Sequence, residues 1–138
     1  MQRNTLLYLT LVLAIAGAIL NYLAGIFYFY WTYWWFDILV HFLVGFTGGL
    51  SIYWGLFCSG IIFRGRFSSK FVSVAIVFVC VMIVGVGWEI FEYAFGITDS
   101  YENIYALDVL IDLLADGTGA FLAALIGVNY VLDSNSAA

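Results

Sequence analysis

The sequence predicts an all-α fold: an integral membrane four-helix bundle made of two parallel-repeat helical hairpins. Of its 138 residues, 65% are hydrophobic and 9% are charged, whereas a soluble domain carries about 25% charged residues. Four apolar stretches each reach the roughly 20 residues that a helix needs to cross a bilayer. The two halves of the chain also align with one another without a gap.

A single transmembrane domain is expected over residues 1–138, because a chain of this length forms one domain. The spans are predicted at roughly 5–25, 34–62, 71–95 and 105–132. The second stretch is longer than a perpendicular span, so we expect it to tilt or to extend beyond the membrane. The first stretch also has the charge and the small residues of a secretory signal peptide, but the repeat requires it as a helix.

The basic residues predict the orientation in the membrane. They are Arg3, ahead of the first span, and Arg64, Arg66 and Lys70, between the second and third spans. If all four segments cross, both places lie on one side, which the positive-inside rule makes cytoplasmic. Both termini are therefore expected in the cytoplasm, with the protein in the cell membrane. The nearly all-aromatic loop at residues 26–33 then faces outward and is typical of an interfacial belt.

The internal duplication relates residues 1–66 to residues 71–138. Its offset is 71 residues, the separation between Asp37 and Asp108. The Thr47-Gly48 pair matches Thr118-Gly119 at the same offset. Because one offset relates two helices in each half, the repeat is predicted to be parallel, with a pseudo-twofold axis along the membrane normal. Shared apolar composition is the alternative explanation. Small residues at 45 and 49, and at 119 and 123, favour close helix packing.

Ionisable side chains inside the predicted spans are the strongest functional signal. They are Asp37 and His41 in the second span, Glu89 and Glu92 in the third, and Asp108, Asp112 and Asp116 in the fourth. Within each span they recur every three or four residues, which puts them on one face of a helix. The predicted topology brings these faces together in the outer half of the membrane. Asn21, the repeat mate of Glu92, is expected beside them.

No Arg or Lys is predicted on the outer side to neutralise these acids. A charged side chain near the centre of a membrane helix costs about 2.5–3.5 kcal/mol on insertion scales, so a compensating charge is expected. The leading hypothesis is a divalent metal ion as cofactor, held by all seven residues. An imidazole among carboxylates suits Mn, Fe or Zn, and oxygen ligands alone suit Mg or Ca.

Two other means of compensation remain open. Clustered carboxyl groups can share protons, as in the polar core of a transporter. A basic subunit of a larger membrane complex can pair with the acids, which gives the chain an accessory or structural role. The expected partners are thus the lipid bilayer and a membrane-protein subunit or a second copy. A metal-dependent enzyme of lipid head groups is a further version of the metal hypothesis. Four basic residues and a net charge of −5 exclude nucleic-acid binding.

These motifs carry a family likeness. Asp37-x-x-x-His41, Trp88-Glu89-Ile90-Phe91-Glu92-Tyr93 and Asp108-x-x-x-Asp112-x-x-x-Asp116-x-x-Gly119-Ala120 resemble the YjdF-like family of small bacterial and archaeal membrane proteins. They resemble the VanZ-like membrane proteins more distantly. The likeness covers the second to fourth spans and implies a membrane fold with a polar intramembrane site. It implies no established reaction, and the VanZ-like pattern has Gln and Asn where this chain has Glu and Asp.

Overall fold

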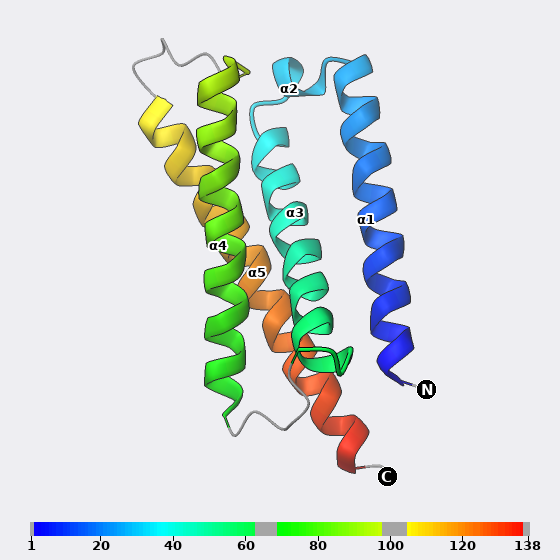
Figure 1. Ribbon diagram of the computed structural model, residues 1–138. Helices are drawn as coiled ribbons and strands as arrows, with labels where there is room; N and C mark the ends of the chain where they lie inside the picture. Colours follow the sequence, from blue (N-terminus) through cyan, green and yellow to red (C-terminus); the bar gives the residue numbers. More distant parts are fainter. Residues whose placement is uncertain (1, 63–68, 98–104, 137–138) are drawn as a thin grey trace.

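The computed structural model of the protein describes residues 2–62, 69–97 and 105–136. Its elements are α1 (Gln2–Ile26), α2 (Phe29–Thr32), α3 (Phe36–Tyr53), the π-helix η1 (Trp54–Cys58), α4 (Lys70–Phe95) and α5 (Tyr105–Ser136). Within these residues the secondary structure is helical and includes no strand (Figure 1). The predicted all-α class is therefore confirmed.

Four helical segments are long and apolar enough to cross a membrane. They cover Asn4–Ile26, Phe36–Cys58, Lys70–Phe95 and Tyr105–Tyr130. The shortest have 23 residues, which at about 1.5 Å per residue exceeds the roughly 30 Å of a bilayer core. The second segment ends at Cys58, whereas the sequence suggested residue 62. It ends there because Gly60 has a φ of 73°, a left-handed conformation that stops a helix.

Glycines set the close packing of α3 on α5. A Cβ atom on Gly45 would lie 2.6 Å from the Cα of Asp116, and one on Gly119 would lie 2.6 Å from the backbone nitrogen of Phe46. A Cβ on Gly49 would likewise lie 2.8 Å from the Cβ of Ala123. The two backbones can approach this closely only because these positions carry no side chain. The small residues predicted to pack therefore do so.

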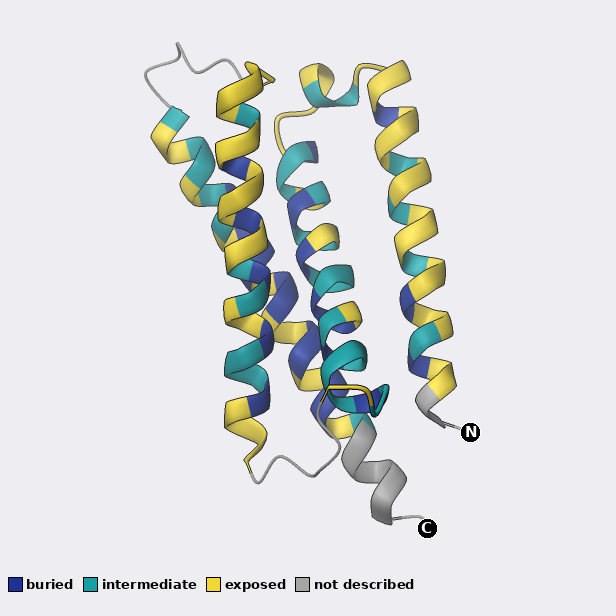
Figure 2. Cartoon of the chain, viewed as in Figure 1, coloured by how far each residue is buried: buried dark blue, intermediate teal, exposed yellow. Residues whose placement is uncertain are grey.

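The helix α4 packs against α3 and α5 through one stripe of its surface. The buried residues of this stripe recur every four residues, at Ser73, Val77, Val81, Gly85 and Glu89. The rest of α4 is largely exposed, as Figure 2 shows. This division is expected for a helix that faces lipid on one side and protein on the other.

The helix α1 lies at the edge of the bundle and packs mainly on α3 (Figure 1). Among its described side chains only Leu6, Thr10 and Ala24 are buried. The bundle is thus a close group of α3, α4 and α5 with α1 beside α3. Both termini lie at one end of the bundle, here called the termini end, and α2 lies at the other, the α2 end (Figure 1). The parallel duplication of the two hairpins stays a prediction.

Candidate cation site

The helix α3 supplies a histidine that is bracketed by carboxylates. Asp37 and His41 are four residues apart and so share a helix face. The Nε2 atom of His41 lies 3.9 Å from Oδ1 of Asp37. Its Nδ1 atom lies 3.4 Å from Oδ2 of Asp116, which comes from α5. The side chain of His41, 9% exposed, therefore connects acids of two helices.

A third acid completes a group of candidate metal ligands. Asp112 precedes Asp116 by one turn of α5, and both are buried. One ligand atom each from Asp37, His41 and Asp112 lie within 4.8 Å of one another. Ligand atoms this close can contact one ion after small side-chain rotations, since zinc-to-ligand distances are about 2.0–2.3 Å.

The helix α4 makes room for the acids and adds one of its own. A Cβ atom on Gly85 would lie 2.7 Å from Oδ2 of Asp116. Any larger residue at position 85 would therefore collide with this carboxylate. Glu89 lies one turn further along the same stripe and is 6% exposed. We call Asp37, His41, Glu89, Asp112 and Asp116 the acidic cluster.

Two oxygens of the acidic cluster have no hydrogen-bond partner in the described structure. They are Oε1 of Glu89 and Oδ1 of Asp116, both shielded from solvent. A buried polar atom without a partner is costly, and more so if it is charged. Among the described basic side chains, Lys70 begins α4 at the termini end, far along the helix from Glu89. No described Lys side chain therefore balances these acids, and a protonated His41 would balance only one of them.

Three of the seven predicted ligands are only half-buried. One is Asp37, which belongs to the group of close ligand atoms, and the other two are Glu92 and Asp108. Their charges act on Asp37, so they belong to the same electrostatic environment, but the group of three close ligand atoms does not include them. The structure thus brings five of the seven residues into the acidic cluster and leaves two beside it.

The orientation of His41 suits metal binding. If Nδ1 carries the proton and donates a hydrogen bond to Asp116, the lone pair of Nε2 is free and faces Asp37. A histidine that binds a metal typically donates a hydrogen bond from its other ring N–H to a carboxylate, and this bond fixes its tautomer and ring orientation. Asp116 then acts as a positioning residue for His41.

Tyr30 of α2 was read from the sequence only as part of the aromatic belt. Its hydroxyl donates a hydrogen bond to Oδ1 of Asn21, and its ring packs edge-on against Phe36 at 5.2 Å. Burial raises the pKa of Tyr30, and the charges of Asp37 and Glu92 raise it further. Tyr30 therefore lies near the acids at the α2 end, whereas Asn21 is exposed and bonded to Tyr30.

Two features of the site were not predicted, and one of them had a signal in the sequence. Gly85 stands four residues before Glu89, so a small residue on the acidic face of this helix was readable. The hydrogen bond between Tyr30 and Asn21 had no such signal, because it depends on how the loop folds back on α1.

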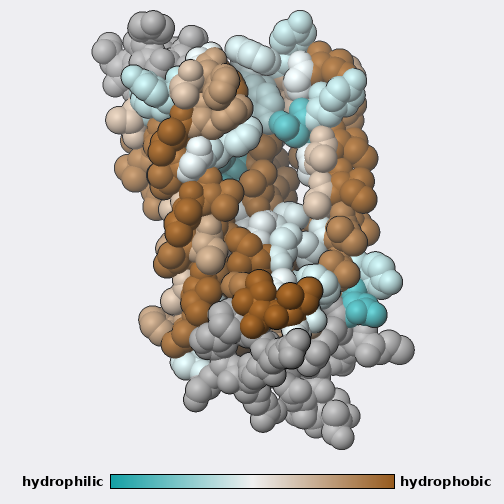
Figure 3. Space-filling view, in the orientation of Figure 1, coloured by the Kyte–Doolittle hydropathy of each residue, from teal (hydrophilic) through white to brown (hydrophobic). Residues whose placement is uncertain are grey.

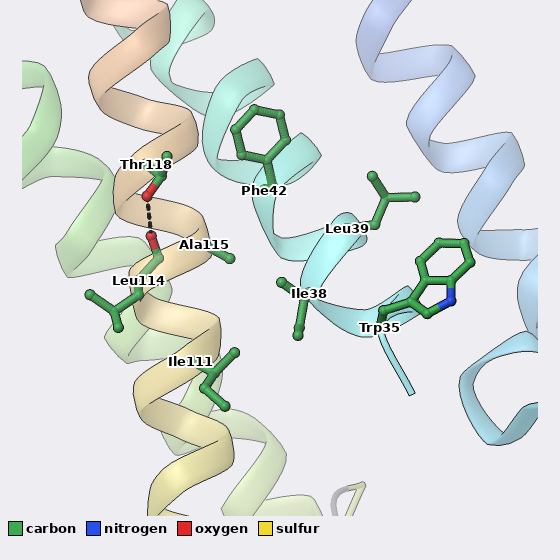
Figure 4. A pocket seen from close by; sticks show the side chains of 8 residues that line it. All are labelled: Trp35, Ile38, Leu39, Phe42, Ile111, Leu114, Ala115 and Thr118. Atoms are coloured by element: carbon green, nitrogen blue, oxygen red, sulfur yellow. Dashed lines mark hydrogen bonds between the residues drawn. The ribbon is translucent and has the colours of Figure 1, made fainter. Parts of the chain in front are cut away.

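A separate groove lies between α3 and α5 (Figure 4). It has a volume of about 530 Å³ and is lined by Trp35, Ile38, Leu39, Phe42, Ile111, Leu114, Ala115 and Thr118. The Thr118 hydroxyl donates a hydrogen bond to the carbonyl of Leu114 at 2.7 Å. The groove presents apolar side chains and no member of the acidic cluster.

Residues 1–133 match the family described as "Predicted membrane protein (DUF2238)". This is the YjdF-like family, so that resemblance is confirmed, and the match extends back through the first span. The more distant VanZ-like resemblance stays a prediction. No curated protein and no solved structure matches the chain.

Proposed function

The chain belongs to the DUF2238 family of membrane proteins, and we propose that it binds a divalent cation in the acidic cluster. The observation that carries the proposal is the pair of buried, unpartnered carboxylate oxygens on Glu89 and Asp116. They lie beside a group of three close ligand atoms from Asp37, His41 and Asp112. One divalent ion would neutralise two of these acids at once.

The geometry favours a cation over the two alternatives. A basic partner subunit would need access to the acids, but Glu89, Asp112 and Asp116 are 6%, 4% and 3% exposed and are covered by the chain's own helices. Shared protons would neutralise carboxyl groups, and a protonated His41 would balance only one of the carboxylates around it. A divalent ion would balance two of the groups that converge within 4.8 Å. A metal ion accounts for both the burial and the convergence.

The ligand types point to a class of ion. Two carboxylates and one imidazole suit Mn, Fe or Zn better than Ca, which takes six to eight oxygen ligands. Three protein ligands also leave at least one coordination position open, as in metal sites that bind a substrate.

The test is the metal content of the purified protein, measured by inductively coupled plasma mass spectrometry. We expect about one ion per chain, and we expect Asp112→Asn to lose it because a charged ligand is replaced by a neutral one. Asp133→Asn is the matched control, since that acid lies in the last turns of α5, beyond the apolar segment that ends at Tyr130. A native protein that folds without stoichiometric metal would contradict the proposal and leave shared protons as the explanation.

We also propose that the protein lies in the cell membrane with both termini in the cytoplasm. Support comes from the two termini and Lys70, which lie at one end of the bundle (Figure 1), and from the positive-inside rule. The acidic cluster would then lie in the outer half of the membrane. Green fluorescent protein at the C-terminus should fluoresce, and alkaline phosphatase there should be inactive. The reverse pattern would invert the topology.

A further inference from the structure

A strip of α3 is uncovered although α3 is the central helix of the bundle. Gly45 and Gly49 are pressed against α5, but a Cβ atom on Gly48 would meet nothing within 4 Å. Val44 is 58% exposed, and Ser51 is exposed as well. These positions share one helix face, so the strip runs lengthwise along α3.

The uncovered strip forms the floor of a hollow between α1 and α4. Gly17 lies seven residues from both Thr10 and Ala24, on the face of α1 that is turned toward the bundle, yet its Cβ would also meet nothing within 4 Å. Figure 3 shows the hollow, with brown hydrophobic flanks and paler, more hydrophilic atoms in its depth. We call this space the lateral hollow. Because its walls are membrane-spanning helices, it opens sideways to lipid.

The lateral hollow leads to the acidic cluster. Asp37 lies on the same face of α3 as Val44 and Gly48, seven and eleven residues before them. Its side chain is 43% exposed, whereas that of Asp116 is 5% exposed. Asp37 is therefore the member of the acidic cluster that a molecule in the hollow would reach first.

Aromatic side chains lie beside the cluster at the α2 end. Tyr30 is bonded to Asn21 and packed against Phe36, and the charges of Asp37 and Glu92 act on it. A ligand from the bilayer thus meets the uncovered strip of α3, whereas an anionic ligand from the outer water meets the half-buried acids Glu92 and Asp108. This difference points to a membrane-dissolved ligand.

We propose that the lateral hollow binds a lipid whose head group carries a phosphate, with the phosphate on the bound cation. This inference rests on the proposed cation site. Three protein ligands leave a coordination position open, and phosphate oxygens are common ligands of hard cations held by one or two carboxylates. From Asp37 to Ser51 the strip is about 20 Å long at 1.5 Å per residue, which is enough to seat one acyl chain of a leaflet.

The charge of the site makes the proposal specific. The acidic cluster is negative, and the described side chains around it include no Lys or Arg that could hold a phosphate directly. Lipid binding must therefore depend on the metal ion. Removal of the ion would leave carboxylates that repel the phosphate.

The experiment is native mass spectrometry of the detergent-purified full chain with Mn²⁺ and dioleoyl phosphatidic acid. Dioleoylglycerol has the same chains without the phosphate and serves as the ligand control. We expect one phosphatidic acid per chain, at least tenfold preference over dioleoylglycerol, and loss of binding with a chelator. Gly48→Leu fills the hollow and should weaken lipid binding at least tenfold while the metal content stays unchanged. Gly87→Leu is the matched control, because Gly87 lies on the exposed face of α4, opposite the buried stripe with Gly85 and Glu89.

The outcomes separate the two proposals. If no metal is bound, the cation site itself fails. If metal is bound but dioleoylglycerol binds equally well, or a chelator leaves the lipid in place, the phosphate-lipid inference is overturned and the cation site stands. If inorganic phosphate displaces the lipid at equal concentration and Gly48→Leu has no effect, the ligand is free phosphate and the lipid inference is also overturned. Ser51→Leu, at an exposed position of the same strip, replaces Gly48→Leu if that variant does not fold.

Discussion

The two ends of the bundle are built from the same helices but bury opposite kinds of side chain. At the termini end, the buried cluster is apolar and draws on α1, α3, α4 and α5, with Leu6, Leu50, Val77 and Ala124 among its members. Toward the α2 end, the buried side chains of α3, α4 and α5 include His41, Glu89, Asp112 and Asp116. The apolar half can hold the helices together while the polar half is kept for a ligand. The close α3–α5 crossing at Gly45 and Gly119 lies next to Asp116, where the two halves meet.

Stability and ligand binding are therefore separable along the bundle axis. Apolar burial within a bilayer is stabilised by close packing rather than by removal from water. Burial of acids without a counter-charge opposes folding. Substitutions in the two halves should therefore affect different measurements.

The largest loss of stability is expected where α3 and α5 pack most closely, at Gly45 and Gly119. Gly45→Ala should lower the free energy of unfolding by about 3 kcal/mol, because the new Cβ would collide with the backbone of Asp116 rather than with a movable side chain. Unfolding in a denaturing-detergent titration measures it. Gly48→Ala, three residues on, is the matched control and should be neutral or slightly stabilising. Equal stability of both variants would show that the helices do not cross this closely.

The next effect tests the apolar half alone. Leu50 is fully buried, so Leu50→Ala should lower the free energy of unfolding by about 2 kcal/mol through the cavity it leaves. The same titration measures the loss, and the metal content of the folded protein should not change. If the metal is lost with the stability, the two halves are not independent.

A third test concerns the polar half alone. Asp116→Asn should weaken metal affinity about tenfold, because it removes the charge that supports His41. Competition with a fluorescent chelator measures the affinity. Asp108→Asn, outside the acidic cluster, should have a smaller effect. The metal-free Asp116→Asn protein should be at least as stable as the native one, since a buried acid is gone. An unchanged affinity would remove Asp116 from its positioning role.

The smallest effect is expected at the α2 end. Tyr30→Phe removes the hydroxyl that bonds to Asn21 and should lower the free energy of unfolding by about 1 kcal/mol. Tyr93→Phe, at an exposed tyrosine, is the control and should leave it unchanged. A neutral Tyr30→Phe would indicate that the aromatic side chains at this end are held by ring packing alone.

Much of this contrast could be predicted from the sequence. Hydropathy predicted the four crossing helices, and residue spacing predicted which acids share a helix face. Small residues at positions 45, 49, 119 and 123 predicted the close approach of α3 and α5. Each of these signals is local, because it depends on a helix period or on a run of apolar residues.

The remainder depends on contacts between helices, which spacing does not encode. Lipid-facing and protein-facing apolar residues look alike in a membrane sequence, so the edge position of α1 could not be read. Residue spacing also treats Glu89 and Glu92 alike, although packing buries the first and leaves the second half-exposed. The metal itself and the duplication stay predictions.

The π-helix η1 changes which side chains of the second membrane-spanning segment face the bundle. Its hydrogen bond from the Ser59 nitrogen to the Trp54 carbonyl spans five residues, one more than an α-helical bond. The wider turn brings Tyr53 and Cys58, five apart in the chain, both to the buried side. In an uninterrupted α-helix the second would point well away from the first. One extra residue in a single turn thus keeps the last turn of this segment, at the termini end, facing its neighbouring helices.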